Sequence, residues 1–165
     1  MLQKLYLNTI LVFVSLFLVA MLFSACQSPS AYEENIGLNP EGWYYKDTLL
    51  FKADIQDIEK PYNVFLNIRH SSEYSKRNLW LKIVTIFPNG KVETAPLNVP
   101  MADLDGKWFG TGFGSVLSNQ IQIQKNAIFE SKGIYEFKIV QDMRYNPVTE
   151  LIDVGMQIDQ IKEEE

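Results

Sequence analysis

Hydrophobic and polar residues alternate along most of the chain after residue 42. In the segment from Asn78 to Phe87, Leu79 and Leu81 fall on one face and Trp80 on the other, which is the period of two of a β-strand. Both faces of this segment are largely apolar, so we expect a strand buried on both sides. Helical spacing is sustained nowhere in this region. The pattern therefore predicts an all-β domain.

Six further segments have strand character. They are Thr48–Ala53, Asn63–Arg69, Lys91–Leu97, Asn119–Gln124, Ile134–Asp142 and Asp153–Ile161. The tripeptide Pro88-Asn89-Gly90 tolerates the backbone of a tight turn and predicts a hairpin between the strands on either side of it. Short strands separated by turns predict an antiparallel β-sandwich, Ig-like or jelly-roll-like, with an eight-stranded barrel as the alternative.

The prolines of this region agree with that arrangement. A proline cannot donate a backbone hydrogen bond, so it is confined to strand ends, edges and loops. We expect strand ends or loops at Pro61, Pro96, Pro100 and Pro147.

The N-terminal segment has the order of a bacterial lipoprotein signal. Lys4 carries the only charge of the first 25 residues, the apolar stretch 10–23 follows it, and the small residues Ser24 and Ala25 precede Cys26. We expect residues 1–25 to be removed and the Cys26 thiol to be acylated, so that acyl chains hold the protein to a membrane. An uncleaved membrane helix and an ordinary signal peptide with an incidental cysteine are the alternatives.

Residues 26–41 are predicted to form the acylated cysteine and a flexible tether, because the stretch Gln27–Asn39 is rich in small, polar and acidic residues. Residues 42–165 are then a single sandwich domain. The chain has 15 basic and 20 acidic residues and a net charge of −5, which argues against a nucleic-acid partner. With Cys26 as its only cysteine, the domain has no internal disulfide.

Few residues are suited to catalysis. His70 is the only histidine, which excludes a site with several histidine ligands, and no Gly-x-Ser-x-Gly motif surrounds Ser71 or Ser72. We interpret His70 as a polar residue that closes the strand ending at Arg69. No cofactor is expected, and the protein is predicted not to be an enzyme.

Residues 101–114 combine acidic, aromatic and glycine residues. Asp103 and Asp105 form a weak candidate calcium site, because the pattern lacks the glycine and glutamate of an EF-hand. The glycines at 110, 112 and 114 lack the strand and helix context of a nucleotide-binding loop. Trp108, Phe109 and Phe113 are candidate partner-binding residues, since aromatic side chains often anchor interfaces. They could equally close one end of the core.

Several ordered blocks extend over most of the chain from Gly42 to Ile161: residues 61–69, 78–81, 87–91, 101–113, 133–135, 143–144 and 153–155, with Phe129. Together these blocks resemble the gliding motility lipoprotein GldH family of Bacteroidota. The resemblance implies a membrane lipoprotein that takes part in gliding motility with other motility or secretion proteins. It implies no catalytic residues. Relatives in species that do not glide leave a general envelope role open.

Our leading hypothesis is a lipid-anchored, non-enzymatic envelope protein that uses a loop surface to hold a partner of the motility machinery. The alternative is a carbohydrate-binding or glycan-processing sandwich, based on the 13% aromatic content and on Asp103 and Asp105 near Trp108. A calcium-stabilised module is a third reading. Residues 27–30 lack an acidic cluster, which favours an outer-membrane anchor that faces the periplasm.

Overall fold

The computed structural model describes residues 30–161, and every regular element in that range is a β-strand. The strands are β1 (Tyr32–Gly37), β2 (Leu49–Ile55), β3 (Tyr62–Ser71), β4 (Asn78–Ile86), β5 (Val92–Pro100), β6 (Thr111–Phe113), β7 (Val116–Ala127), β8 (Gly133–Gln141) and β9 (Leu151–Gln160). Among these residues no helix is long and apolar enough to cross a membrane. The predicted all-β class is confirmed.

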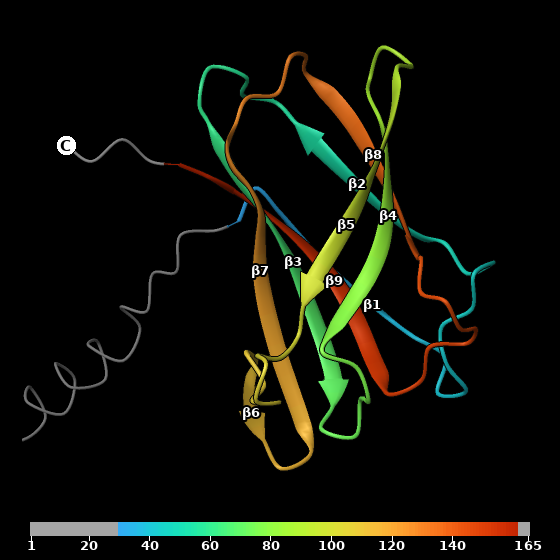
Figure 1. The fold of residues 1–165 in the computed structure, drawn as a ribbon. Coiled ribbons are helices and arrows are strands. Elements are labelled where there is room, and N and C mark those ends of the chain that lie inside the picture. The colour runs from blue at the N-terminus through green and yellow to red at the C-terminus, as the bar shows by residue number, and fades with distance from the viewer. Residues whose placement is uncertain (1–29, 162–165) are drawn as a thin grey trace, which may run out of the picture.

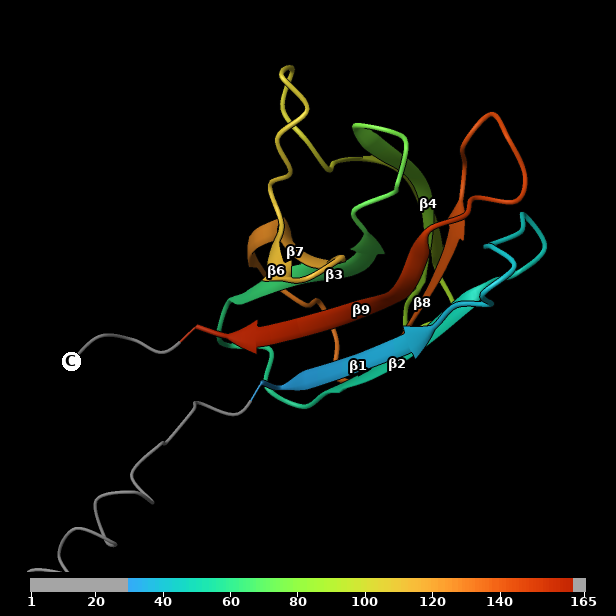
Figure 2. The same ribbon diagram turned by 90° about the horizontal axis from the view of Figure 1, so that it is seen from below.

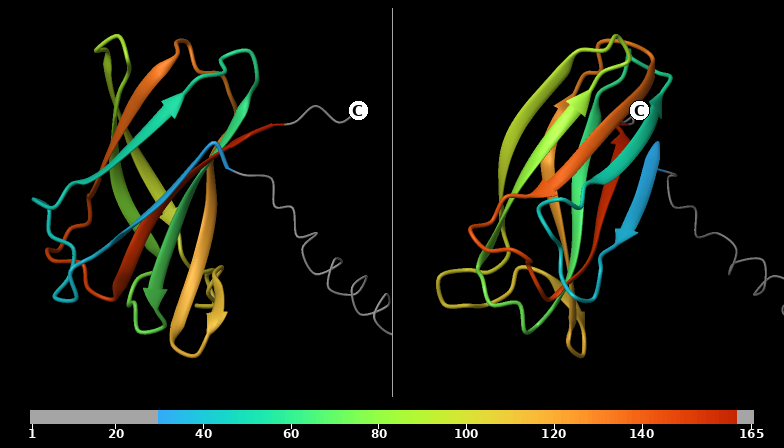
Figure 3. Two further views of the ribbon diagram at one scale, coloured as in Figure 1. Left: turned by 180° about the vertical axis from the view of Figure 1, so that it is seen from behind. Right: turned by 90° about the vertical axis from the view of Figure 1, so that its right-hand side faces the viewer.

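The strands form two antiparallel sheets that pack face to face (Figure 1). The five-stranded sheet has the order β1-β9-β3-β7-β6, and the four-stranded sheet has the order β2-β8-β4-β5. Figure 2 shows the two sheets as layers, and Figure 3 shows them from behind and from the side. The predicted antiparallel sandwich is therefore confirmed, and the barrel alternative is wrong because the sheets stay separate.

The connectivity of the sandwich is that of a jelly roll. Strand β1 pairs with β9, β2 with β8, β3 with β7 and β4 with β5, and successive pairs fall in alternate sheets. This nesting is what results when one long antiparallel hairpin is rolled into two sheets. Strand β6 is an addition at the edge of β7. Of the two sandwich types expected from the sequence, the jelly roll is the one observed.

Alternating burial along the strands builds the core. In β2, the residues Leu49, Phe51, Ala53 and Ile55 are buried and those between them are exposed. From the opposite sheet, Met156 and Ile158 of β9 are fully buried. Each fully buried aliphatic side chain stabilises the fold by about 1.5–3 kcal/mol, so the facing rows of apolar residues hold the sheets together.

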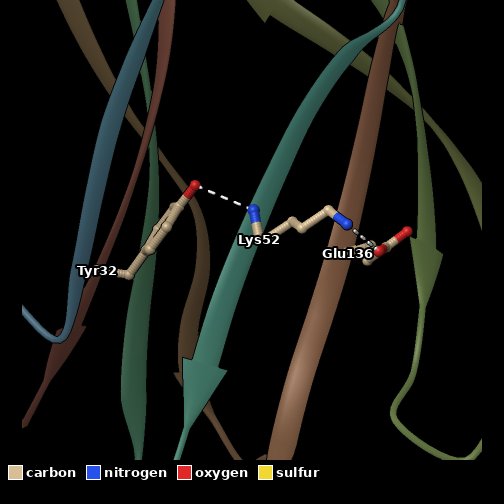
Figure 4. Close-up of polar contacts among 3 residues, drawn as sticks. All are labelled: Tyr32, Lys52 and Glu136. Carbon is tan, nitrogen blue, oxygen red and sulfur yellow. Dashed lines mark hydrogen bonds and ion pairs between the residues drawn. The ribbon is translucent and has the colours of Figure 1, made fainter.

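The two long sides of the sandwich differ. On one side β1 lies beside β2, and the backbone N–H of Lys52 donates a 3.1 Å hydrogen bond to the hydroxyl of Tyr32 (Figure 4). The Lys52 ammonium pairs at 2.7 Å with Glu136 of β8, the neighbouring strand in the same sheet. On the other side, between β5 and β7, an apolar cleft of about 370 Å³ reaches toward Val64 and Met156. The sandwich is thus joined along one side and open along the other.

Strand β1 corrects the prediction of a tether over residues 26–41. Tyr32 and Ile36 lie opposite Ile158 and Val154 of β9, and both pack against the core. Two inward apolar residues are enough for an edge strand, and the polar residues between them obscure the pattern. The folded domain therefore includes Tyr32–Gly37 and does not begin at residue 42. Cys26 and the predicted signal peptide 1–25 lie outside the described residues.

The remaining strand predictions are confirmed with shifted ends, apart from the expected burial of β4. Leu79 and Leu81 are fully buried, whereas Trp80 on the other face is 42% exposed. A sandwich has only two layers, so the outer face of each sheet remains in contact with water. The predicted hairpin between β4 and β5 is present, and Gly90 adopts a φ of +85° there. The expectation of a strand end or loop at Pro96 is wrong, because Pro96 lies inside β5, an edge strand that tolerates a residue without an N–H.

His70 does not close its strand. Strand β3 continues to Ser71, and the side chain of His70 is completely buried on the inner face. The period of two places His70 on the same face as Leu66 and Ile68, so it enters the core at the end of the sandwich. The interpretation of this histidine as a strand-closing polar residue was wrong.

Candidate partner-binding surface

The segment 101–114, here called the aromatic loop, joins β5 to β7 and contains the short strand β6. It lies at the end of the sandwich where β3 ends and β4 begins (Figure 1). In Figure 2 the yellow part of this segment stands away from both sheets. Leu104 of the aromatic loop is 86% exposed, so the loop offers an apolar side chain to its surroundings.

The base of the aromatic loop is a small hairpin. Ala102 and Trp108 form an antiparallel bridge, and the N–H of Phe109 donates a 3.0 Å hydrogen bond to the carbonyl of Met101. The buried side chain of Asn119 on β7 donates a 3.0 Å hydrogen bond to the carbonyl of Pro100. These contacts fix where the aromatic loop leaves the sheet.

Asp103 and Asp105 lie in one turn of the aromatic loop, and the weak calcium site expected there remains a prediction. The Oδ1 atom of Asp103 accepts hydrogen bonds from the N–H groups of Asp105 at 3.0 Å and Lys107 at 2.8 Å. An aspartate that binds backbone donors ahead of it in this way shapes a tight turn. Within residues 30–161, no group of three or more His, Cys, Asp or Glu side chains is arranged to hold a metal ion.

Trp108 is the anchor of the aromatic loop. Its side chain is half-buried and packs against the core, with its ring 4.7 Å from that of His70 and 6.3 Å from that of Tyr74 between centroids. Tyr74 is itself buried, and its hydroxyl donates a 2.9 Å hydrogen bond to the carbonyl of Asn78. The three rings close this end of the core.

His70 is held as a neutral side chain within this cluster. Its Nδ1 donates a 2.8 Å hydrogen bond to the carbonyl of Ser71, which assigns the proton to Nδ1. Burial lowers the pKa of His70 below its usual 6.5, and the bond to the Ser71 carbonyl opposes that shift only in part. The imidazole therefore packs as an aromatic ring.

Phe109 and Phe113 point outward instead. Their side chains are 55% and 97% exposed. The glycines around them permit a close approach to β7, since a Cβ at Gly110 would lie 2.9 Å from the carbonyl oxygen of Ser118 and one at Gly112 would collide with the carbonyl oxygen of Val116. Packing against β7 thus explains Gly110 and Gly112, whereas Gly114 adopts a φ of +65° between β6 and β7, where a Cβ would meet no atom within 4 Å.

The three aromatic residues singled out in the sequence therefore divide into two roles. Trp108 closes the core, whereas Phe109 and Phe113 are available to a partner. Leu104 and Asn119 were not among the predicted residues. Asn119 shares the inner face of β7 with Ile121 and Ile123, and this spacing of two residues could have identified it as a polar side chain that faces inward.

The family model of the GldH lipoprotein matches residues 30–158. The chain belongs to the GldH lipoprotein family. The matched range takes in all of β1–β8, most of β9 and the whole aromatic loop.

Two curated relatives agree with this GldH assignment. A gliding motility lipoprotein GldH homolog of Christiangramia forsetii is 33% identical over 156 residues, which cover 90% of this chain and 94% of the relative. The gliding motility lipoprotein GldH of Flavobacterium johnsoniae is 28% identical over 152 residues, which cover 88% of this chain and 94% of the relative. The similarity extends over nearly the full length of each relative.

Membership in the GldH family confirms the resemblance expected from the sequence. Because this is a lipoprotein family, the protein is a membrane-anchored protein of the cell envelope. The match begins at residue 30, just before β1, so the GldH domain starts earlier than the sequence pattern indicated. Cys26 precedes both the matched range and the described residues, and its acylation remains a prediction.

Proposed function

We propose that this protein is a lipid-anchored, non-enzymatic component of the gliding motility machinery, whose aromatic loop binds a partner protein of the cell envelope. Both curated relatives are named as gliding motility lipoproteins, which supports the process. Acyl chains on Cys26 provide the anchor in this proposal.

The exposure of the aromatic loop carries the proposal. Leu104, Phe109 and Phe113 are 86%, 55% and 97% exposed, although each has a large apolar side chain. All three come from one loop, and large apolar side chains, aromatic ones above all, contribute much of the binding energy of an interface when a partner buries them. Trp108 holds the base of the loop against the core, so these residues are presented from a fixed support.

The position of the N-terminal strand also supports a partner at the loop. Tyr32 of β1 and Val64 of β3 both lie opposite Ile158. His70, which contacts the aromatic loop through Trp108, is six residues farther along β3, a distance of about 20 Å at 3.3 Å per residue. The chain thus enters the sandwich well away from the aromatic loop.

We also propose that the protein is not an enzyme. Two residues are suited to acid–base chemistry, and both have structural contacts instead. His70 is buried under Trp108, and Asp103 accepts two backbone hydrogen bonds within a turn. Both side chains have structural contacts that account for their positions.

For the anchor, we propose an outer-membrane location with the domain facing the periplasm. Labelled palmitate should be incorporated into the wild-type protein and not into Cys26→Ala.

The domain should resist protease added to intact cells and become sensitive once the outer membrane is permeabilised. Cleavage in intact cells would contradict the periplasmic orientation.

Cross-linking in the native envelope tests the partner surface. The chromosomal copy is replaced by a tagged Leu104→Ser/Phe113→Ser variant, cells are cross-linked, and captured proteins are identified by mass spectrometry. We expect the variant to accumulate normally and to lose at least one neighbour captured by the wild type. In a host that glides, colony spreading should also decrease in this variant.

The matched control is Ile134→Ser, because Ile134 is 55% exposed on β8 at the opposite end of the sandwich. This variant should keep the same cross-linked neighbours and the same spreading. An unchanged set of neighbours in the aromatic-loop variant would overturn the proposed interface.

A further inference from the structure

The outer face of the five-stranded sheet is rich in carboxamide side chains. One row across this face contains, in order from β1 to β7, Asn35, Gly155, Asn67 and Gln120. Leu66 and Ile68, on either side of Asn67, are fully buried, so Asn67 projects to the outside. The neighbouring row adds Gln157, whose oxygen accepts a 2.9 Å hydrogen bond from the amide nitrogen of Gln120.

Gly155 brings the carboxamide of Asn35 toward the middle of the sheet. A Cβ at position 155 would collide with the side chain of Asn35 and lie 3.1 Å from the carbonyl oxygen of Glu34. Without that Cβ, the Asn35 side chain lies across β9 in the direction of β3. An amide from an edge strand thereby joins those of the central strands.

A hollow of about 460 Å³ opens on this face beside the aromatic loop. We call it the amide hollow. Its lining includes Asn35, Asn67, Arg69, Phe109, Ser118 and Gln120, together with Thr111 of the aromatic loop. Phe109 is 55% exposed and forms the aromatic part of the lining. The volume is within the range of sites for small ligands.

The charge in the amide hollow is balanced. The Nε atom of Arg69 lies 3.3 Å from Oδ2 of Asp153, which neighbours it on β9. This ion pair offsets the positive charge and orients the guanidinium group, while the terminal amino groups remain as hydrogen-bond donors. The other polar lining groups are neutral amides and hydroxyls.

From this arrangement we propose that the amide hollow binds a neutral glycan chain. Carboxamides donate and accept hydrogen bonds side by side, which suits the adjacent hydroxyls of a sugar ring. An exposed aromatic ring provides an apolar surface for the C–H face of the same ring. A charged ligand would instead require an unbalanced cation or anion, and the Arg69–Asp153 pair provides neither.

This inference goes beyond the proposed protein interface, although the amide hollow shares Phe109 and Thr111 with the aromatic loop. In the cell envelope the same chemistry is offered by the glycan strands of peptidoglycan and by the polysaccharide of the outer membrane. Two arms of one experiment distinguish these sources. Full-length protein in detergent micelles is incubated with purified sacculi in one arm and with immobilised lipopolysaccharide in the other.

We expect wild-type protein to bind in one arm and the double variant Asn67→Ala/Gln120→Ala to bind at least about tenfold more weakly. Ser118→Trp should fill the amide hollow without removing an amide, and it should therefore abolish binding. Retention in the sacculus arm alone assigns peptidoglycan, and retention in the lipopolysaccharide arm alone assigns the outer-membrane polysaccharide.

The controls separate this site from the partner surface and from loss of folding. Gln122→Ala removes an exposed amide from the same strand but outside the amide hollow, and should bind as the wild type does. Phe113→Ala should keep glycan binding even where it loses the protein partner. No binding in either arm, or equal losses in Gln122→Ala and the double variant, would overturn the inference while leaving the protein interface untouched.

Discussion

The ring of Trp108 lies 4.7 Å from the ring of His70, inclined at 60°, and this contact ties the aromatic loop to the end of the core. Trp108→Ala removes that tie and leaves a gap over His70 and Tyr74. Because Trp108 is only half-buried, we expect a loss of about 2 kcal/mol, below the 3–5 kcal/mol typical of a fully buried tryptophan. Urea unfolding measures the loss. Phe113→Ala in the same loop should change stability by less than about 0.5 kcal/mol, and equal losses would contradict the two roles.

The buried His70 should make stability depend on pH. Burial lowers its pKa in the folded protein below the value of 6.5 in the unfolded chain. As the pH falls through 6.5 the unfolded chain takes up a proton that the folded protein does not, so this residue destabilises the fold progressively until its folded pKa is reached. His70→Gln removes that contribution. Urea unfolding at about pH 7.5 and 5.5 should therefore show a smaller loss in the variant than in the wild type. An identical loss in both proteins would disprove this assignment.

The hydroxyl of Tyr32 links the edges of the two sheets. It accepts a 3.1 Å hydrogen bond from the N–H of Lys52 and donates one to Glu34, and its pKa is raised mainly by burial. We expect Tyr32→Phe to destabilise the fold by about 1 kcal/mol in thermal or urea unfolding. Tyr145→Phe is the control, because within residues 30–161 the Tyr145 hydroxyl makes no direct hydrogen bond. A larger effect in the control would be evidence against the link.

Gly112 should be required for the hairpin between β6 and β7. A Cβ at this position would collide with the carbonyl oxygen of Val116, so Gly112→Ala must separate the two strands. We expect faster amide hydrogen exchange at Thr111–Phe113 and a stability loss of about 1–3 kcal/mol. Gly37→Ala is the matched control, since a Cβ there meets no atom within 4 Å. Unchanged exchange in Gly112→Ala would show that the hairpin tolerates a side chain.

Local pattern predicted the long strands well. The alternation around Leu79 and Leu81 and the turn at Gly90 are local properties, and they correspond to β4 and its hairpin. Strands β1 and β6 were missed for different reasons. Strand β1 has only two inward apolar residues and depends on β9, a partner strand distant in sequence. Strand β6 has only three residues, too few to show an alternating pattern, although its partner β7 follows directly in the chain.

The candidate site was found only in part. The concentration of glycine and aromatic residues drew attention to residues 101–114, yet the different roles of Trp108 and Phe113 could not be read from it. That difference depends on His70 and Tyr74, which come from β3 and the turn after it. The amide hollow was not foreseen, because its residues come from three strands and the aromatic loop.

The sequence by itself determined the strand-rich class, most strand positions and the family, because these follow from side-chain alternation and from the order of motifs along the chain. Tertiary structure alone decided which sheet each strand joins, which aromatic ring is buried and which amides meet around Gly155. The physical reason is range. Alternation reflects the local geometry of a strand, in which successive side chains point to opposite faces. Register and layer packing depend instead on contacts between strands far apart in the chain, such as Asn35 against Gly155.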